Sequence, residues 1–230
     1  MTRATVPTHV GFILDGNRRW AKAHGLPTYE GHLAGYNALK DVIAAVADAG
    51  VRYISLYTWS TENWNRAEQE VKGMMRLIKR VFAVDLAELV TQGYRVVVAG
   101  TRDGLPSDIV EIIEKTEAAS ANGTRATVVM CFNYGGQREI IDAVKTIVQA
   151  GYSADEVTDE LVANSLYVPE IPPCDVIVRT SGEKRLSNFM LWRAAYSEFI
   201  FLEKNWPEMT SEDVAGILEE YQRRERRIGG

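Results

Sequence analysis

The sequence has only two cysteines and no long apolar run. Cys131 and Cys174 show no CxxC or CxxH spacing, which argues against a zinc site and favours buried thiols in a reducing compartment. No uninterrupted apolar stretch approaches the roughly 18 residues that a membrane span needs. The N-terminal segment has no apolar signal region. We therefore expect a cytoplasmic protein with at most peripheral contact with membrane lipid.

An excess of basic charge and the common catalytic signatures are also missing. The 26 lysines and arginines are outnumbered by 31 aspartates and glutamates, so nucleic acid is not an expected partner. No HExxH, P-loop or GxSxG pattern occurs, and Asn17 stands where a DxDxT phosphatase motif has its second aspartate. The 230 residues contain no repeat or long linker, so a single domain over 1–230 is expected.

The stretch from His9 to Trp20 organises the rest of the sequence. An apolar run at 10–14 ends at Asp15, and four polar or flexible residues follow at once: Gly16, Asn17, Arg18 and Arg19. In open α/β sheets, ligands bind outside the carboxyl ends of the strands. There a carboxylate can hold a divalent metal while arginines hold phosphate. The alternative is an ordinary Asp-Gly turn with two solvated arginines.

Strand and helix patterns alternate along the chain. Apolar and β-branched runs predict strands at 10–14, 51–58, 94–99, 125–132, 175–178 and 199–202. Periodicity and capping residues predict helices at 18–24, 32–49, 68–92, 106–121, 138–149, 153–166, 187–195 and 211–227. The alternation predicts an α/β fold with a six-stranded, mainly parallel sheet surrounded by helices. Polar strand ends then meet at one edge of the sheet: Asp15, 60–66, Arg102 with Asp103, 133–136 and Arg179.

Two of these strand ends carry groups suited to a ligand. The loop 59–66 combines Trp59 and Trp64 with polar side chains, so it is either a lid that closes over a ligand or a loop whose tryptophans pack against the sheet. The segment 179–187 holds two arginines, a lysine and several hydroxyls. It suits a diphosphate clamp, and the alternative is a solvated charged loop in which Ser187 caps a helix.

The predicted helix 68–92 and Glu198 extend this hypothesis. The helix is apolar over more than one narrow stripe, which indicates that it is deeply buried or lines an apolar ligand. Glu198 has aromatic and apolar neighbours, so it can join Asp15 at a divalent ion or form a structural salt bridge with Arg193. Metal-assisted handling of diphosphate beside an apolar helix points to a lipid diphosphate.

A set of motifs lies in order along nearly the whole chain. The motifs are DGNRRWA at 15–21, GH at 31–32, SxENW at 60–64, NYGG at 133–136, RTSGExRxSNFxLW at 179–192, AYSE ending at Glu198, and RRERRIGG at 223–230. This set resembles the cis-prenyltransferases, the undecaprenyl diphosphate synthase family. The resemblance implies a homodimer and a hydrophobic tunnel between sheet and helices. It also implies Mg²⁺-dependent condensation of isopentenyl diphosphate onto an allylic diphosphate such as farnesyl diphosphate, each new double bond being Z.

The resemblance also implies roles for individual residues. Asp15 is a catalytic residue and a Mg²⁺ ligand, Glu198 is the second metal carboxylate, and Asn63 matches the position of proton removal, although a neutral amide is a poor base. The allylic diphosphate is bound by Gly16, Asn17, Arg18, Arg19 and His32, beside Trp20. The mobile substrate loop holds Ser60, Thr61, Glu62, Trp64 and Arg66. Isopentenyl diphosphate is framed by Arg179, Arg185, Leu186 and Ser187, and Arg227-Ile228-Gly229 resembles an RxG tail that reaches this site across the dimer.

Alternatives remain open for the length of the product and for the class of function. Thr28 stands where many family members have arginine, and Arg18 where many have glycine. Thr58 and Phe132 fall near length-setting positions and are bulkier than in some long-chain relatives, whereas the wide helix 68–92 favours a long chain. Undecaprenyl diphosphate is the first expectation and a short- or medium-chain product the second. The rivals are a non-catalytic subunit of a hetero-oligomeric prenyltransferase, against which Asp15 and the arginine clamp argue, and a metal-dependent phosphohydrolase.

Overall fold

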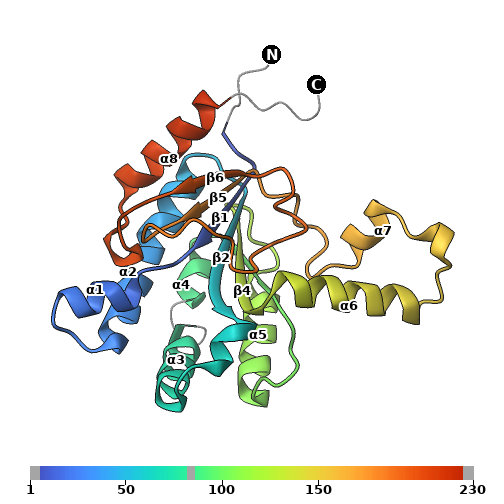
Figure 1. Ribbon diagram of the computed structural model, residues 1–230, viewed down its shortest axis with the longest axis horizontal. Helices are drawn as coiled ribbons and strands as arrows, with labels where there is room; N and C mark the ends of the chain where they lie inside the picture. Colours follow the sequence, from blue (N-terminus) through green and yellow to red (C-terminus); the bar gives the residue numbers. More distant parts are fainter. Residues whose placement is uncertain (1–5, 82–85, 225–230) are drawn as a thin grey trace.

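The computed structural model describes residues 6–81 and 86–224, and its centre is a six-stranded sheet (Figure 1). All five strand pairings are parallel, in the order β3-β4-β2-β1-β5-β6. The strands are β1 His9–Ile13, β2 Tyr53–Ser60, β3 Arg95–Ala99, β4 Thr127–Tyr134, β5 Val176–Arg179 and β6 Glu198–Phe201. The predicted α/β class and all six strands are therefore confirmed.

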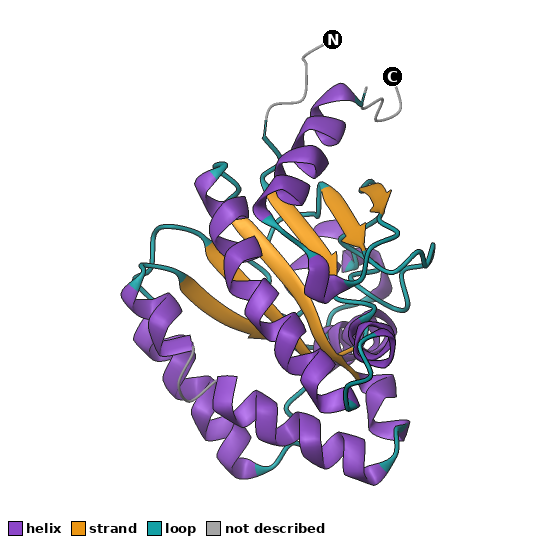
Figure 2. Cartoon of the chain, turned by 90° about the vertical axis from the view of Figure 1, so that its left-hand side faces the viewer, coloured by secondary structure: helices purple, strands orange, loops and turns teal. Residues whose placement is uncertain are grey.

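Helices surround the sheet, and Figure 2 shows the longest of them crossing its face. The α-helices are α1 Asn17–Ala23, α2 Thr28–Asp48, α3 Glu68–Arg80, α4 Leu86–Thr91, α5 Ser107–Ser120, α6 Gly136–Gln149, α7 Asp159–Asn164 and α8 Ser211–Arg223. The 3-10 turns are η1 Thr61–Asn65, η3 Ala154–Glu156 and η4 Trp206–Glu208. In Figure 1, α6 and α7 extend away from the sheet.

The sheet separates two hydrophobic clusters because alternate residues of a strand point to opposite faces. Val10 and Phe12 of β1 join the larger cluster, together with α2, whose Val42 and Ile43 are fully buried. Ile13 joins the smaller cluster. Both cysteines are free and buried as predicted, and burial raises the pKa of each thiol. The central strand β1 is thus buried on both faces, and this rigid support ends at Asp15.

The predicted helix at 187–195 is wrong. This segment consists of turns, because Ser187, Asn188 and Met190 have φ values of 48°, 65° and 45°. Such left-handed backbone cannot continue a right-handed helix. The segment instead folds back over the sheet and buries Phe189 in the smaller cluster.

Four other predicted helices differ in extent from those observed, and one of them, α2, begins at Thr28 instead of His32. The described part of 68–92 contains two helices, α3 and α4, and residues 82–85 lie outside the described ranges. The predicted helix 153–166 is reduced to η3 and the short α7, and α8 is described as far as Arg223. No helix among the described residues is long and apolar enough to cross a membrane.

Candidate functional site

A cavity of about 390 Å³ opens at the carboxyl ends of the central strands. Asp15 follows β1, Ser60 ends β2 and Arg179 ends β5, and all three line the cavity. Ile13 and Arg179 are register partners in the parallel pair, so the end of β5 lies directly beside the end of β1. The predicted convergence of strand ends is therefore observed at Asp15, 60–66 and Arg179.

Asp15 and Arg179 form the central ion pair of the cavity. The Nη2 group of Arg179 donates to Oδ2 of Asp15 at 2.8 Å, and Nη1 donates to Oγ of Ser187 at 2.8 Å and to the Arg185 carbonyl at 2.6 Å. The Arg179 side chain is only 5% exposed, whereas that of Asp15 is 28% exposed. A buried guanidinium thus presents its charge to the cavity from a fixed position.

The backbone around Asp15 is held from a part of the chain that the sequence did not single out. The Asp15 carbonyl accepts hydrogen bonds from Oγ1 of Thr180 at 2.6 Å and from the backbone N–H of Trp206 at 2.9 Å. Gly16 has a φ of 105°, and a Cβ there would lie 2.5 Å from Oδ1 of Asn205. Thr180 stands inside the predicted clamp, but Asn205 and Trp206 follow the edge strand β6 without a motif that marks them.

Arg19 and Arg185 lie beside this pair and share one acidic partner. Arg19 Nη1 donates to both the carbonyl and Oγ of Ser181 at 2.5 Å, and its Nη2 pairs with Glu183. Arg185 pairs with the other oxygen of Glu183. About half of each arginine side chain is exposed (50% for Arg19 and 58% for Arg185). Both arginines can therefore turn to an anionic ligand. We call the group of Asp15, Arg19, Arg179 and Arg185 the polar end of the cavity.

Helices α1 and α2 approach closely at this end. A Cβ at Gly35 would lie 2.2 Å from Oδ1 of Asn17, so only glycine permits this contact. Among the described residues, buried side-chain atoms without a hydrogen-bond partner include Oδ1 of Asn17, Nε2 of His32 and Nε of Arg179. Buried polar atoms rarely stay unpaired in folded proteins. Their grouping beside the cavity indicates a site whose hydrogen bonds are completed by a ligand.

His32 is neutral in this setting. Burial lowers its pKa to about 4, and the nearby Arg66 guanidinium adds to this effect. A neutral imidazole at neutral pH offers one N–H donor and no positive charge. His32 can therefore donate a hydrogen bond to an anion, while the arginines supply the charge.

The loop 60–66 forms part of the cavity wall, and its two tryptophans pack inward. Trp59 belongs to β2 and is 1% exposed, and Trp64 packs edge-on against it with ring centroids 5.6 Å apart. The alternative that the tryptophans pack against the sheet is therefore confirmed, and closure of this loop over a ligand stays a prediction. Asn63 Oδ1 accepts the Ser60 N–H at 3.1 Å, which closes a capping box for η1.

The cavity gathers most, but not all, of the predicted site residues. Those that line it are Asp15, Asn17, Arg19, His32, Ser60, Asn63, Arg66, Arg179, Arg185 and Ser187, and a small side pocket adds Gly16 and Arg18. Its lining does not include Trp20, Thr61, Glu62, Trp64, Leu186 and Glu198, all of which are described. Trp20 stacks on His24 instead, and Glu62 accepts a hydrogen bond from Asn188. Arg227-Ile228-Gly229 lies outside the described residues.

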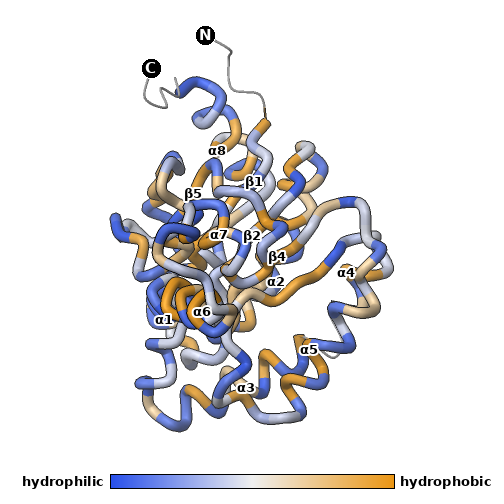
Figure 3. The backbone as a smooth tube through the Cα atoms, turned by 90° about the vertical axis from the view of Figure 1, so that its right-hand side faces the viewer, coloured by the Kyte–Doolittle hydropathy of each residue, from blue (hydrophilic) through white to orange (hydrophobic). Residues whose placement is uncertain are grey.

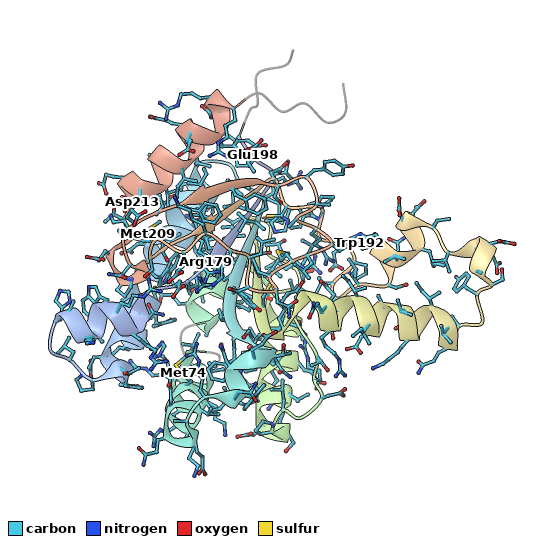
Figure 4. The ribbon with its side chains drawn as sticks, viewed as in Figure 1. Met74, Arg179, Trp192, Glu198, Met209 and Asp213 are labelled. Carbon is cyan, nitrogen blue, oxygen red and sulfur yellow. The ribbon has the colours of Figure 1, made fainter. Side chains whose placement is uncertain are left out.

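Glu198 lies far from Asp15 within one chain. It is the first residue of β6 and pairs in register with Val176 at the start of β5, whereas Arg179 ends β5 (Figure 4). The Glu198 carboxylate pairs with Arg224 at 2.7 Å, and Arg193 pairs with Glu139 instead. The prediction that Glu198 joins Asp15 at one ion within a chain is therefore wrong, as is the suggested Arg193 bridge. A metal role of Glu198 stays a prediction.

The opposite side of the cavity is apolar. Its wall is formed by β4, α2 and α3, with Met74 of α3 labelled in Figure 4. The residues of this apolar end are Leu39, Met74, Leu77, Ile78, Val81, Met130 and Phe132. The predicted hydrophobic space between sheet and helices is thus present, and α3 lines it as the apolar pattern of 68–92 indicated.

The polar end can hold a divalent ion only together with a ligand. Among the described residues, no group of three or more His, Cys, Asp or Glu side chains is arranged to bind a metal. Asp15 is the one carboxylate among the residues that line the cavity. This fits Mg²⁺, which commonly binds one or two carboxylates and completes its shell with water and substrate phosphate oxygens.

Comparison with known proteins decides the family. A family model described as "Putative undecaprenyl diphosphate synthase" matches residues 13–229. The isoprenyl transferase of Agrobacterium fabrum is 43% identical, over 99% of this chain and 94% of its own length. The chain belongs to the cis-prenyltransferase family. It is therefore an enzyme that transfers prenyl groups, as predicted, and the rival hypotheses of a non-catalytic subunit and a phosphohydrolase are set aside.

Two solved structures of prenyl diphosphate synthases share this fold. The structure of lavandulyl diphosphate synthase from Lavandula x intermedia, in complex with dimethylallyl diphosphate, superimposes with a TM-score of 0.94 at 29% identity and covers 98% of this chain and 99% of its own. A "probable undecaprenyl diphosphate synthase" from Campylobacter jejuni gives a TM-score of 0.84 at 26% identity, with coverage of 97% and 99%. The sheet and helices described above are thus those of the family.

Proposed function

We propose that this enzyme condenses isopentenyl diphosphate with an allylic diphosphate in a Mg²⁺-dependent reaction and forms a Z-prenyl diphosphate. In this reaction the C–O bond of the allylic diphosphate breaks, a C–C bond forms to isopentenyl diphosphate, and one proton leaves. The observation that carries the proposal is one cavity that is lined by four arginines and has an apolar wall on its opposite side. Such a cavity matches a molecule with a diphosphate head and a hydrocarbon tail.

Different residues at and beside the polar end suit each of the two diphosphates. Arg179, Arg185 and Ser187 offer a fork of donors suited to isopentenyl diphosphate, while Arg19, His32 and the start of α1 suit the allylic diphosphate. Asp15 would hold Mg²⁺ together with substrate phosphate oxygens. When bound, the ion supplies positive charge that stabilises the departing diphosphate.

Asn63 positions groups rather than accepting the proton. Its amide oxygen is occupied by the Ser60 N–H, which leaves the amide NH₂ to donate toward the cavity. A neutral amide has no basicity near neutral pH. The proton therefore leaves through another acceptor, for which the departing diphosphate is the available anion.

The size of the cavity bears on product length. At about 390 Å³ it lies near the lower limit of small-molecule pockets, which span roughly 300 to 1,000 Å³. Phe132 and Met130 fill the β4 wall and are almost fully buried. This geometry favours a short- or medium-chain product. Undecaprenyl diphosphate remains the candidate that the family resemblance implies, and its longer chain would need more space than this cavity provides.

The exposed face of α6 supports the proposed homodimer. Ile141, Val144 and Val148 follow one another at helical spacing and are 52%, 49% and 69% exposed. Figure 3 views the molecule from the side to which α6 projects and shows hydrophobic residues along it. A second copy would cover this stripe. Val148→Glu should shift sedimentation from dimer to monomer, whereas Lys145→Glu on the same helix should not, and a wild-type monomer would contradict the proposal.

The test of the proposed function is turnover with defined substrates. The purified protein is incubated with labelled isopentenyl diphosphate, Mg²⁺ and dimethylallyl, geranyl or farnesyl diphosphate, and the products are read by mass spectrometry and by NMR of the new double bond. We expect Z-prenyl diphosphates that disappear with EDTA. Absence of product with all three primers from well-folded protein, or release of inorganic phosphate alone, would overturn the proposal.

A further inference from the structure

Asn133, the first residue of the NYGG motif, has no role in the site described so far. It lies near the carboxyl end of β4, is 3% exposed and does not line the cavity. Its φ of 50° is in the left-handed region, which asparagine tolerates better than most residues. A buried polar side chain on left-handed backbone requires a specific reason to be there.

Hydrogen bonds fix the direction of the Asn133 amide. Nδ2 donates to the carbonyls of Thr101 at 2.8 Å and Asp103 at 3.1 Å. Only the NH₂ group can meet two carbonyls, so the amide oxygen must face the other way. There Oδ1 accepts the indole Nε1–H of Trp64 at 2.8 Å. The loop after β3 thus orients Asn133, and Asn133 in turn holds Trp64.

Trp64 lies between two residues that do line the cavity. Asn63 precedes it and Arg66 follows two positions later, and both face the cavity. Its ring packs edge-on against Trp59 at an interplanar angle of 80°, and the Arg66 guanidinium lies over Trp59 at 5.7 Å. A rotation of the Trp64 indole would therefore move η1 and the three cavity residues Trp59, Asn63 and Arg66.

The same motif also reaches the clamp segment. The N–H of Gly136 donates to the Asn188 carbonyl at 2.7 Å, and Nδ2 of Asn188 donates to Oε1 of Glu62 at 2.7 Å. The loop 60–66 is thus fastened at Trp64 by Asn133 and at Glu62 by Asn188. Of the two contacts, the Asn133–Trp64 hydrogen bond is the more buried.

We propose that Asn133 is a positioning residue that sets the placement of Asn63 and Arg66 through its hydrogen bond to Trp64. The proposal rests on the prenyl-transfer function proposed above. Asn133 touches no substrate in this account. Its effect on catalysis passes through the indole N–H of Trp64 and the loop that carries it.

The test is a double-mutant cycle. Asn133→Gly removes the amide and still accepts a φ of 50°, so the backbone is not strained. Trp64→Phe removes the indole N–H and keeps an aromatic ring. In the wild-type background we expect Asn133→Gly to lower kcat/KM about tenfold, as for a buried hydrogen bond left incomplete. In the Trp64→Phe background, which already lacks this hydrogen bond, Asn133→Gly should lower kcat/KM by less than about a further twofold. Asn122→Gly, in an exposed turn at the opposite end of β4, is the matched control and should leave kcat/KM unchanged.

A spectroscopic readout separates this proposal from the proposed function. With the five tryptophans labelled as 5-fluorotryptophan, the ¹⁹F signal that vanishes in Trp64→Phe identifies Trp64. We expect Asn133→Gly to shift that signal and leave the Trp192 signal in place, whether or not the protein turns over prenyl substrates. An unshifted Trp64 signal, equal losses of kcat/KM in both backgrounds, or wild-type activity of Trp64→Phe would overturn the proposal. The activity of Trp64→Phe tests the proposal even if Asn133→Gly does not fold.

Discussion

The two ends of the cavity are built in opposite ways. At the polar end, strand ends, loops and helix termini hold Asp15, Arg179 and their neighbours, and buried atoms of Asn17, His32 and Arg179 have no partner among the described residues. At the apolar end, regular elements supply tightly packed hydrocarbon side chains such as Leu77, Met130 and Phe132. The polar end is therefore incomplete without a ligand, whereas the apolar end resembles an ordinary core with space left in it.

This difference separates the substitutions that should affect the reaction rate from those that should affect the size of the product. A substitution at the polar end removes charge that acts on the departing diphosphate, so it should reduce the rate. A substitution at the apolar end changes volume and packing, so it should change product length and stability.

Removal of the Asp15 carboxylate should have the largest effect on the rate. Asp15→Ala deletes the proposed Mg²⁺ ligand and leaves the buried Arg179 guanidinium without its acidic partner. We expect kcat to fall by at least about a hundredfold, in line with the loss of one preorganised electrostatic contact. Steady-state kinetics measure the change. Asp15→Asn preserves shape and serves as the control for folding, and a variant of either kind with near wild-type kcat would refute the polar end as the reaction centre.

Enlargement of the apolar end should lengthen the product and leave the rate of the first condensation nearly intact. Phe132→Ala removes a ring from the β4 wall, with a loss of about 3–5 kcal/mol in the free energy of unfolding. Mass spectrometry should show additional isoprene units. Val128→Ala, on the same strand and buried away from the cavity, should destabilise the protein and leave product length unchanged. Equal product lengths in wild type and Phe132→Ala would contradict the assignment of this wall.

Two buried histidines allow a comparison of the polar end, where His32 lies, with the opposite end of β1, where His9 lies. Burial lowers the pKa of both His9 and His32 from 6.5 to about 4. Each therefore stabilises the fold above pH 6.5, and this stability is lost as the pH falls from 6.5 toward 4, by about 1 kcal/mol per pH unit for each group. Urea unfolding at pH 7, 6 and 5 should show a flatter dependence in His9→Gln or His32→Gln than in wild type.

A diphosphate ligand should distinguish these histidines. Both ring nitrogens of His9 have partners, the Pro172 carbonyl and Oγ of Ser55, whereas Nε2 of His32 has none among the described residues. Inorganic diphosphate with Mg²⁺ should therefore shift the imidazole ¹⁵N resonances of His32 and leave those of His9 unchanged. Shifts in the ¹⁵N resonances of both histidines, or of His9 alone, would contradict the assignment of His32 to the anion site.

The smallest effect is expected at Arg18. Its side chain is 61% exposed and lies 3.8 Å from Glu70, so it contributes as a solvated charge. Arg18→Ala should raise KM for the allylic diphosphate by only about two- to threefold, as for an exposed ion pair, and the effect should weaken with added salt. Thr28→Arg in the same background should restore KM. A change of tenfold or more would place Arg18 within the polar end.

The fold was predictable because strand and helix signals are local. Apolar and β-branched runs located the ends of all six strands to within two residues, and glycine and proline marked most helix ends. The false helix at 187–195 shows the limit of this approach. Its composition suits a helix, but the positive φ values at Ser187, Asn188 and Met190 depend on tertiary contacts with the sheet. No pattern within the segment encodes those contacts.

The polar end was predictable because carboxyl strand ends meet at one edge of a parallel sheet. Asp15 and Arg179 follow adjacent strands and were therefore placed together correctly. Glu198 is the first residue of its strand, so the same rule places it at the amino edge, where Arg224 is its partner. The contacts of Trp206 and Thr180 with the Asp15 carbonyl could not be foreseen, because a backbone hydrogen bond across the fold leaves no mark in sequence spacing.

The most direct test of the division between the two ends is a crystal structure with bound substrate analogues. Crystals grown with Mg²⁺, isopentenyl diphosphate and a non-hydrolysable allylic thiodiphosphate would place both heads and the tail. We expect diphosphate density at Arg19, Arg179 and Arg185, and hydrocarbon density against Leu77 and Phe132. Diphosphates bound away from Asp15 and these arginines, or a hydrocarbon tail outside the cavity, would contradict it.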